Sequence, residues 1–346
     1  MAGKNNILVG AIIGASALAA LAKWGRKKRE IDFQDKVVLI TGGSRGLGLV
    51  LAREFAKEGA KIAICARDMQ ELERARLDLE ARGAEVFDAV CDVRNQADVE
   101  RLIQDVEMRF GRIDVLVNNA GVIQVGPLEN QTQADFENAM AIHFWGPFYT
   151  MQAVIPKMKR NGGGRIVNIS SIGGKMAVPH LAPYSASKFA LVGLSSAMRA
   201  ELQKDNIFVT TVCPGLMRTG SHINAIFKGQ NELEFAWFSI GNALPVSSVS
   251  AEYAAREIIG ATRRGDAEAI ISIQAELAAK LNSMFPELVA EISALANQLL
   301  PKAGGIGQRH ASGLESTSFV SPSFLTTLVD KASYRNNELK PNESIN

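Results

Sequence analysis

The chain has 346 residues, of which 47% are hydrophobic and 21% are charged, the balance of a globular protein with a packed core. This composition excludes a wholly disordered chain. The net charge is only +2, and residues 1–30 alone carry a local +5, so the rest of the chain sums to −3. No basic surface is left for a phosphate backbone, which argues against nucleic-acid binding.

The N-terminal segment is apolar. Residues Ile7–Ala22 carry no charge and span roughly 24 Å as a helix. The cationic run Arg26–Arg29 follows, and by the positive-inside rule such a flank stays in the cytoplasm. We therefore expect residues 1–30 to be a single-pass membrane anchor with a basic flank, and the rest of the chain to face the cytoplasm. A signal peptide cleaved near Ala20–Ala22 and a helix that does not span the membrane are the alternatives.

Strand-like and helix-like segments alternate after this flank. Apolar runs predict strands at Lys36–Ile40, Lys61–Ala66, Glu85–Val90, Val115–Asn118, Arg165–Ile169, Phe208–Cys213 and Ala269–Ile273. Helical periodicity predicts Gly46–Glu58, Gln70–Arg82, Gln96–Phe110, Gln133–Lys157, Ala182–Asp205 and Ser250–Arg264. This alternation indicates a Rossmann-like, doubly wound α/β domain over residues 34–273, with a seven-stranded parallel sheet covered on both faces. Ligands bind at the carboxyl ends of the strands in such sheets.

The remaining segments are less regular. The connection Leu216–Pro245 is long and contains several aromatic residues, and a loop of that length is usually a functional lid or disordered. We treat it as an aromatic lid. Residues 274–303 form a helical extension broken at Pro286, and residues 304–346, rich in Ser, Asn and Glu, are predicted to be a largely flexible tail. The three cysteines have no CxxC pair and the histidines have no metal-ligand spacing, so we expect reduced thiols and no metal site.

A glycine-rich turn, Thr41–Gly48, connects the first strand to the first helix. Glycines allow a tight turn and a close approach to a pyrophosphate, which the helix N-terminus attracts. The spacing GxxxGxG differs from the common GxGxxG fingerprint. The residues expected to bind a dinucleotide here are Gly42, Ser44, Arg45, Gly46, Leu47 and Gly48.

The residues after the second strand bear on the choice of nucleotide. An acidic side chain at that position would favour NAD, but the sequence has Ala66 followed by Arg67. Two guanidinium groups, on Arg45 and Arg67, suit a 2′-phosphate. We therefore predict NADP(H) as the cofactor.

Together these segments resemble the short-chain dehydrogenase/reductase family. The motifs that carry the resemblance fall in the family's order: Thr41–Gly48, Asp92-Val93, Asn118–Gly121, Ser171, Tyr184-x-x-x-Lys188, and Pro214-Gly215 with Thr219. The resemblance implies that Asp92 and Val93 contact adenine. It also implies that Asn119, Ala120 and Gly121 pass under the cofactor, and that Pro214, Gly215 and Thr219 lie beside the nicotinamide.

The catalytic chemistry centres on Tyr184 and Lys188. They are four residues apart on a predicted helix and so share one face, where an ammonium group stabilises a phenolate and lowers its pKa. By resemblance, Lys188 also binds the nicotinamide ribose and Ser171 polarises a substrate carbonyl, while Tyr184 supplies the proton. Ser170 is the alternative serine, but its spacing to Tyr184 fits the family less well.

One position departs from the family pattern. Where the family often has an asparagine that completes a proton relay, the sequence has His143. We expect activity with an altered relay. A packed helix histidine is the favoured interpretation of His143, and a histidine that titrates near neutral pH is the alternative.

The expected function is an NADP(H)-dependent oxidoreductase that transfers hydride between nicotinamide and a carbonyl or alcohol. The aromatic lid, with Met176, Val178 and Leu181 across the cleft, predicts a bulky lipophilic substrate; alternatively, those aromatics fill the core or a subunit interface. A 3-oxoacyl reductase for carrier-bound chains and a non-catalytic, membrane-tethered NADP-binding regulator remain open. By resemblance, the helices Gln133–Lys157 and Ala182–Asp205 form the interface of a homodimer or homotetramer.

Overall fold

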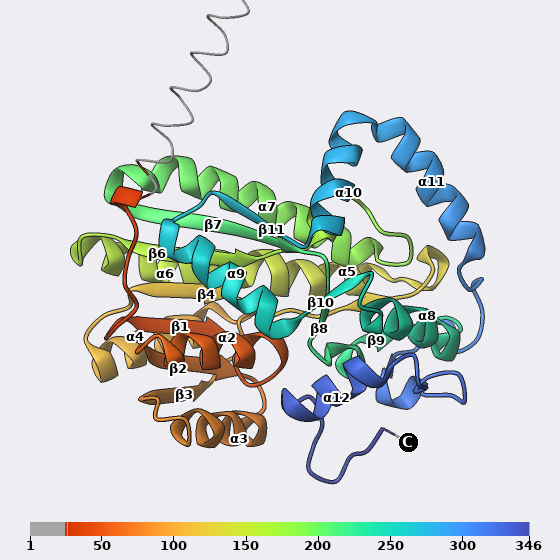
Figure 1. The fold of residues 1–346 in the computed structure, drawn as a ribbon, viewed down its shortest axis with the longest axis horizontal. Coiled ribbons are helices and arrows are strands. Elements are labelled where there is room, and N and C mark those ends of the chain that lie inside the picture. The colour runs from red at the N-terminus through yellow and green to blue at the C-terminus, as the bar shows by residue number, and fades with distance from the viewer. Residues whose placement is uncertain (1–24, 26, 346) are drawn as a thin grey trace, which may run out of the picture.

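The computed structural model describes Gly25 and residues 27–345, and its centre is a parallel sheet (Figure 1). Seven strands lie in the order β11-β7-β6-β4-β1-β2-β3. They are β1 (Val37–Thr41), β2 (Lys61–Ala66), β3 (Val86–Val90), β4 (Val115–Asn118), β6 (Gly164–Ile169), β7 (Ile207–Pro214) and β11 (Glu268–Ile271). The predicted doubly wound fold is confirmed. The strand order reverses between β1 and β4, which is where such sheets bind ligands.

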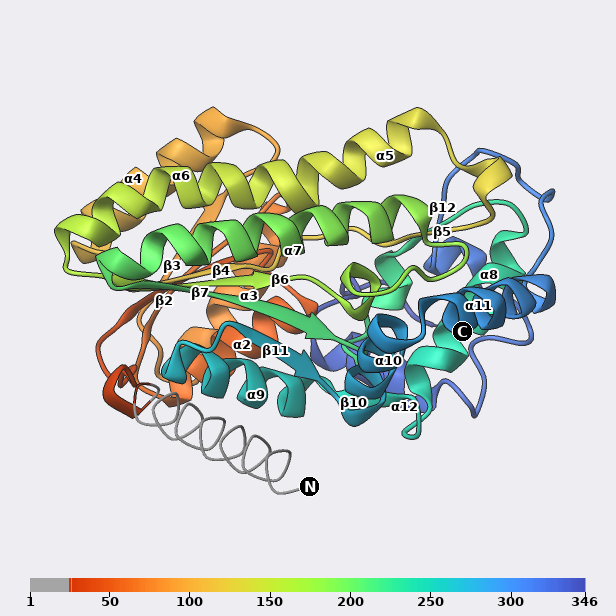
Figure 2. The ribbon, with the colours of Figure 1, turned by 90° about the horizontal axis from the view of Figure 1, so that it is seen from above.

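Helices cover both faces of the sheet (Figure 2). One face carries α2 (Gly46–Lys57), α3 (Met69–Glu80) and α9 (Ala251–Arg264). The other carries α4 (Gln96–Phe110), α6 (Gly146–Arg160) and α7 (Ala182–Leu202). Each layer buries its own cluster of apolar side chains against the strands, so the strands are apolar on both sides.

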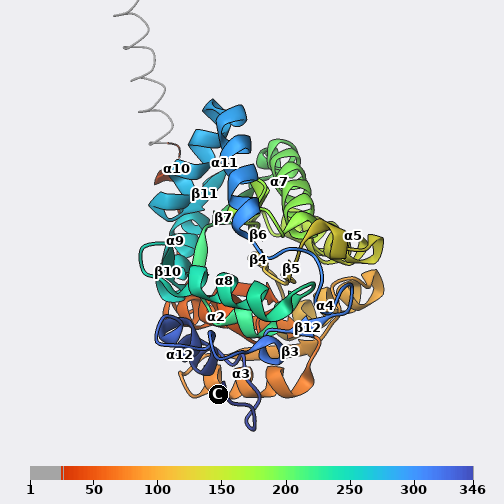
Figure 3. The same ribbon diagram turned by 90° about the vertical axis from the view of Figure 1, so that its right-hand side faces the viewer.

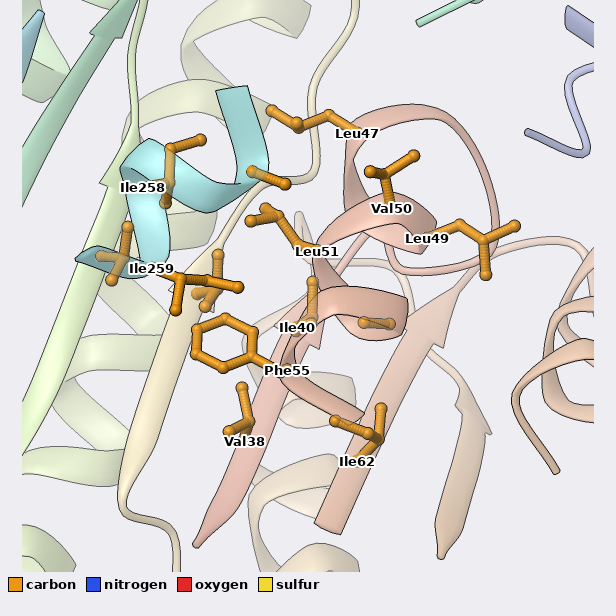
Figure 4. Packing of buried hydrophobic residues seen from close by; sticks show 14 of the residues in the cluster. Val38, Ile40, Leu47, Leu49, Val50, Leu51, Phe55, Ile62, Ile258 and Ile259 are labelled. Carbon is orange, nitrogen blue, oxygen red and sulfur yellow. The ribbon is translucent and has the colours of Figure 1, made fainter. Parts of the chain in front are cut away.

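The packing of α2 sets the position of the turn that precedes it. Leu51 and Phe55 of α2 meet Ile258 of α9 over Ile40 of β1 (Figure 4). All four side chains are fully buried, and each such burial stabilises the fold by roughly 1.5–3 kcal/mol. The N-terminus of α2 is thereby fixed against the carboxyl end of β1.

The predicted helix Gln133–Lys157 contains a defect in the middle. It consists of α5 (Gln133–Met140), a π-helical turn (Ala141–Trp145) and α6. A capping box between Thr132 and Asp135 begins α5. The π turn carries His143, which is only 1% exposed. Such turns inside α-helices are frequently found at functional sites.

The predicted lid is not a loop. It holds β8 (Leu216–Arg218), β9 (Ile226–Phe227) and α8 (Asn231–Ala243). Here β8 pairs with β10 (Ser248–Ser250), while β9 pairs with β5 (Gln124–Val125) and β12 (Ala311–Ser312). Phe227, Phe235 and Phe238 pack in a small separate core. The expectation of an aromatic lid is therefore wrong, because these rings bury one another.

The C-terminal region lies at the end of the sheet where the strands finish (Figure 3). Helices α10 (Ile273–Met284) and α11 (Pro286–Leu299) form a hairpin that breaks at Pro286. Many large apolar side chains on this hairpin are exposed: Ile273, Leu277, Leu281, Met284, Phe285, Leu288, Ile292, Leu295 and Leu299.

The tail after this hairpin, predicted to be largely flexible, is instead packed against the domain. Its helix α12 (Thr327–Arg335) buries Val329 and Ala332, and the residues that follow reach the N-terminus of α2. Within the described part of the chain, no helix combines the length and the apolar character that crossing a membrane requires. The predicted anchor, Ile7–Ala22, lies outside the described residues.

Candidate active site

A cavity of about 690 Å³ opens along the carboxyl ends of the central strands. This volume is within the usual range for a site that holds a cofactor and substrate. Its lining includes every residue predicted to contact the cofactor except Gly48: Gly42, Ser44, Arg45, Gly46, Leu47, Arg67, Asp92, Val93, Asn119, Ala120, Gly121, Tyr184, Lys188, Pro214, Gly215 and Thr219. Ser171 and His143 also line it.

The glycine-rich turn has a backbone conformation that residues with a side chain rarely adopt. Gly42 has φ +63°, and a Cβ on it would lie 2.8 Å from the Cα of Ala120. A Cβ on Gly48 would fall 2.0 Å from the Gly42 carbonyl oxygen, so Gly48 serves the turn itself. The Asn119 side-chain amide donates to the carbonyls of Thr41 and Gly42 at 3.1 and 3.0 Å. Asn119 therefore holds the turn in place from the neighbouring strand end.

The adenosine end of the cavity is marked by Arg67 and Asp92. Arg67 is exposed at the end of β2, and Asp92 is held by Arg94. The hydrogen bonds from the Arg94 side chain lower the pKa of Asp92, and Arg67 adds to this effect. The carboxylate of Asp68 accepts from the backbone N–H groups of Gln70 and Glu71, as the N-cap of α3.

Arg45 has partners that the sequence did not reveal. Its guanidinium forms an ion pair with Glu71 of α3 at 2.8 Å and a second with Glu338 of the tail at 3.4 Å. The residue predicted to bind a 2′-phosphate is thus engaged by two carboxylates of its own chain.

Tyr184 and Lys188 lie one turn apart on α7, as their spacing predicts. The Nζ atom of Lys188 is 5.5 Å from the centre of the Tyr184 ring and donates to the carbonyl of Ile169 at 2.9 Å. Burial lowers the pKa of Lys188 to about 7. Burial also raises the pKa of Tyr184, against a hydrogen bond with Ser171 that lowers it. The expected depression of the tyrosine pKa by the lysine does not hold here, because desolvation dominates.

The two adjacent serines have different surroundings. Ser171 follows β6, and its Oγ accepts from the N–H of Gly173 at 3.0 Å. Its hydroxyl also reaches Tyr184. Ser170 donates to the carbonyl of Lys188 at 3.0 Å and so ties β6 to α7. The geometry thus favours Ser171 over Ser170 as the partner of the tyrosine.

His143 is a buried and neutral histidine. Its Nε2 accepts from the N–H of Val122 at 3.1 Å, so the ring proton is on Nδ1, which faces Ser187. Burial, aided by the charge of Lys188, holds the pKa of His143 well below its ordinary value. The alternative that His143 titrates near neutral pH is wrong, because its charged form would be desolvated. The favoured interpretation, a packed histidine, describes it.

The far end of the cavity is formed by the segment after β7. Gly215 packs against Ala275 of α10, and the hydroxyl of Thr219 donates to Ser221 at 2.8 Å. Met217, Asn224 and Ile226 also line the cavity. Met176, Val178 and Leu181, expected across the cleft, are absent from its lining. His180, near them, instead pairs with the buried Glu234.

Several cavity residues were missed by sequence reasoning. Glu71, Asn224 and Glu338 carry polar groups into it, yet none belongs to a motif. Glu338 lies in a polar stretch without periodicity, so only the fold brings it to the site.

The cavity suits a nicotinamide dinucleotide. A turn whose Cβ positions are blocked, at the N-terminus of a helix, offers close backbone approach to a pyrophosphate. Tyr184, Lys188 and Ser171 stand at the other end of the same cavity.

Comparison with known proteins agrees with this arrangement. The family model described as short chain dehydrogenase matches residues 36–227, more than half of the chain. A CLA biosynthesis dehydrogenase/reductase of Lactiplantibacillus plantarum is 33% identical over 241 residues, which are 63% of this chain and 83% of that protein.

Two solved structures have a similar fold. A variant of the actinorhodin polyketide ketoreductase with NADPH is 30% identical with a TM-score of 0.61, covering 69% of this chain and 95% of that one. A short-chain dehydrogenase/reductase of Burkholderia phymatum with NAD has a TM-score of 0.67 at 22% identity, covering 75% and 96%, which supports the fold alone. The chain belongs to the short-chain dehydrogenase/reductase family and is an oxidoreductase of that family.

Proposed function

We propose that the protein is an NADP(H)-dependent reductase or dehydrogenase acting on a carbonyl or its alcohol. The observation that carries the proposal is the convergence of Ser171, Tyr184 and Lys188 at one end of a cavity whose other end is the glycine-rich turn. A nicotinamide dinucleotide bound there would supply or accept a hydride. The residues of the chain position the substrate and move the proton.

Each of the three residues has a distinct part. The hydroxyl of Ser171 donates a hydrogen bond to the substrate oxygen and orients it toward Tyr184. The phenol of Tyr184 gives its proton to that oxygen during reduction and takes it back during oxidation. Lys188 lies beside the ring, and its protonated form would favour the phenolate that remains, against the desolvation that raises the pKa of Tyr184.

The choice of NADP(H) rests on the adenosine end. Arg67 lines the cavity after β2, and the nearest following carboxylate, Asp68, is engaged as the N-cap of α3. Arg45 lines the same end and exchanges its carboxylate partners for a phosphate when one binds.

A lipophilic substrate is the finer part of the proposal. The cavity that contains Tyr184 is also lined by Val122, Ile123, Met217 and Ile226, and apolar lining selects apolar substrates. A second candidate, reduction of carrier-bound 3-oxoacyl chains, is favoured by the likeness to the actinorhodin ketoreductase.

We also propose that the protein lies at a membrane, with its catalytic domain on the cytoplasmic side. The apolar segment Ile7–Ala22 and the exposed apolar face of α10 and α11 support this.

We propose a homodimer as well. Trp145, in the π-helical turn before α6, and Phe189 of α7 are exposed on adjoining helices, and the surface that they form would be the dimer interface.

One assay tests the activity. Purified full-length protein in detergent is given NADPH with three substrate sets: lipophilic ketones, small polar ketones, and 3-oxoacyl thioesters. We expect oxidation of NADPH, fastest with the lipophilic set. Faster turnover of the thioesters would select the second candidate. Tight NADPH binding without turnover of any set would favour a non-catalytic, NADP-binding regulator.

A further inference from the structure

Three residues that follow α12 connect both rims of the cofactor cavity. We call Asn336, Asn337 and Glu338 the C-terminal strap. They lie far outside the segment that matches the family model, which ends at residue 227. Asn336 is fully buried and Glu338 is 4% exposed, although their stretch of sequence is polar.

The first rim is the glycine-rich turn. The N–H of Gly46, the first residue of α2, donates to the carbonyl of Asn336 at 2.9 Å. The side-chain amide of Asn337 donates to the carbonyl of Ser44 at 2.8 Å and to that of Glu71 at 3.1 Å. The strap thus uses a backbone donor of the kind that holds a phosphate at a helix N-terminus.

The second rim is the segment after β7. The side-chain amide of Asn336 donates to the carbonyl of Thr219 at 3.0 Å. The side-chain amide of Asn224 donates to both the backbone carbonyl and the carboxylate of Glu338, at 2.8 and 2.7 Å. Because the strap is bonded to both rims, it crosses the cavity between them.

The carboxylate of Glu338 lies directly on the turn. One of its oxygens, Oε1, is 2.5 Å from the position that a Cβ on Gly46 would occupy. Its other oxygen faces the guanidinium of Arg45 at 3.4 Å. The side chain of Arg45 does not cap α2, so Glu338 provides an anion at this helix N-terminus.

We propose that the C-terminal strap closes the phosphate part of the cofactor site and that a nicotinamide dinucleotide binds by displacing it. The proposal rests on the proposed function, since it takes the cavity to be the dinucleotide site. The strap uses the Gly46 N–H, the space against Gly46 and the charge of Arg45, all of which a pyrophosphate at this turn needs. Two anions at one helix N-terminus also repel each other.

Docking of the strap buries the carboxylate of Glu338, and the desolvation of this charge favours release of the strap. Burial raises the pKa of Glu338 to about 7, because Arg45 and Asn224 offset only part of the desolvation and Glu71 adds a like charge. The charged groups that face Glu338 are thus Arg45 from the turn and Glu71 from α3. An incoming phosphate would take over Arg45 and leave Glu338 without its cation.

Limited proteolysis of the full-length protein tests the displacement. Arg335 is the last residue of α12, directly before the strap, and is exposed, so tryptic cleavage after Arg335 reports whether the strap is docked. We expect NADPH and inorganic pyrophosphate to accelerate cleavage at Arg335, while adenosine, which lacks phosphates, does not. Protection by NADPH would overturn the proposal, because the strap would then be a clamp over the bound cofactor.

Cofactor affinity provides the second test. A chain ending at Arg335, which keeps α12 whole, and the variant Glu338→Ala should each bind NADPH and NADH about tenfold more tightly, the equivalent of one charge-assisted contact. Calorimetry measures both dissociation constants. Glu343→Ala, in the same tail but outside the cavity lining, should bind like the wild type.

The outcomes separate the strap from the function on which it rests. Unchanged or weaker binding by the shortened chain overturns the displacement and leaves the dinucleotide function standing. If neither the wild type nor the variants bind NADPH or NADH, the proposed function falls and the strap proposal falls with it.

Discussion

The Nδ1 atom of His143 lies 2.8 Å from the Oγ of Ser187, whose hydroxyl donates to the carbonyl of Tyr184 at the same distance. Because the Nε2 of His143 accepts from Val122, the ring is neutral and its proton points to Ser187. His143 therefore connects the strand end at Val122 to the turn of α7 that carries Tyr184. These contacts favour a positioning part for His143 over that of an acid or base.

Removing this connection should destabilise the protein. His143→Ala leaves the Val122 N–H without its partner and opens a void, so we expect the free energy of unfolding to fall by about 3 kcal/mol. Urea denaturation measures this. The pH profile of kcat/KM should contain no inflection due to His143; an inflection near pH 6.5 that disappears in His143→Asn would contradict the neutral histidine.

Lys188 should make stability rise with pH. Its pKa is lowered to about 7 in the folded protein from an ordinary 10.5. Between these values the unfolded chain binds more protons than the folded one, so the free energy of unfolding increases from pH 7 to pH 10. Thermal unfolding of the cofactor-free protein should show this rise, and Lys188→Met should flatten it. An equal rise in that variant would assign the effect to other groups.

Glu338 should act in the opposite direction at lower pH. Its pKa is about 7 in the folded protein and 4.5 ordinarily, so the folded state holds the extra proton between these values. Stability contributed by this group is full below pH 4.5 and is lost as the pH rises to 7. Glu338→Gln should remove that slope in thermal unfolding. An equal slope in the variant would assign the effect to other groups and contradict a raised pKa for Glu338.

The preference for NADP(H) depends on Arg67. We expect Arg67→Ala to lower the ratio of kcat/KM for NADPH to that for NADH by about tenfold or more, because a charge-assisted contact to the 2′-phosphate is lost. Arg101→Ala removes another exposed arginine, which pairs with Asp98 on α4, and should leave the ratio unchanged. A wild-type enzyme that already prefers NADH would refute the assignment of the cofactor.

Most of the fold was accessible from sequence because its strands are buried on both faces. The strand predicted at Lys61–Ala66 is found at those residues, and the one predicted at Phe208–Cys213 lies within Ile207–Pro214. The cavity residues came from motifs next to these strands, whose ends meet at one edge of the sheet. Tyr184 and Lys188 needed only their helical spacing to be placed together.

The strap and the aromatic core were not accessible in this way. Asn336 and Asn337 are buried by hydrogen bonds to backbone carbonyls, and such contacts leave no periodic pattern in the sequence. The rings of Phe227 and Phe235 pack against each other, 5.4 Å apart at their centres, from a strand and a helix that only the tertiary structure brings together. Composition alone therefore indicated disorder in one case and a lid in the other.

The central claim is that Tyr184 transfers the proton in a dinucleotide-dependent reaction. Its most direct test is NADPH oxidation by the wild type and by Tyr184→Phe, with NADPH affinity measured for both. We expect the variant to bind NADPH like the wild type and to lose turnover by about 10³-fold, the range for removal of a general acid. A variant that binds NADPH and keeps wild-type turnover would contradict the account.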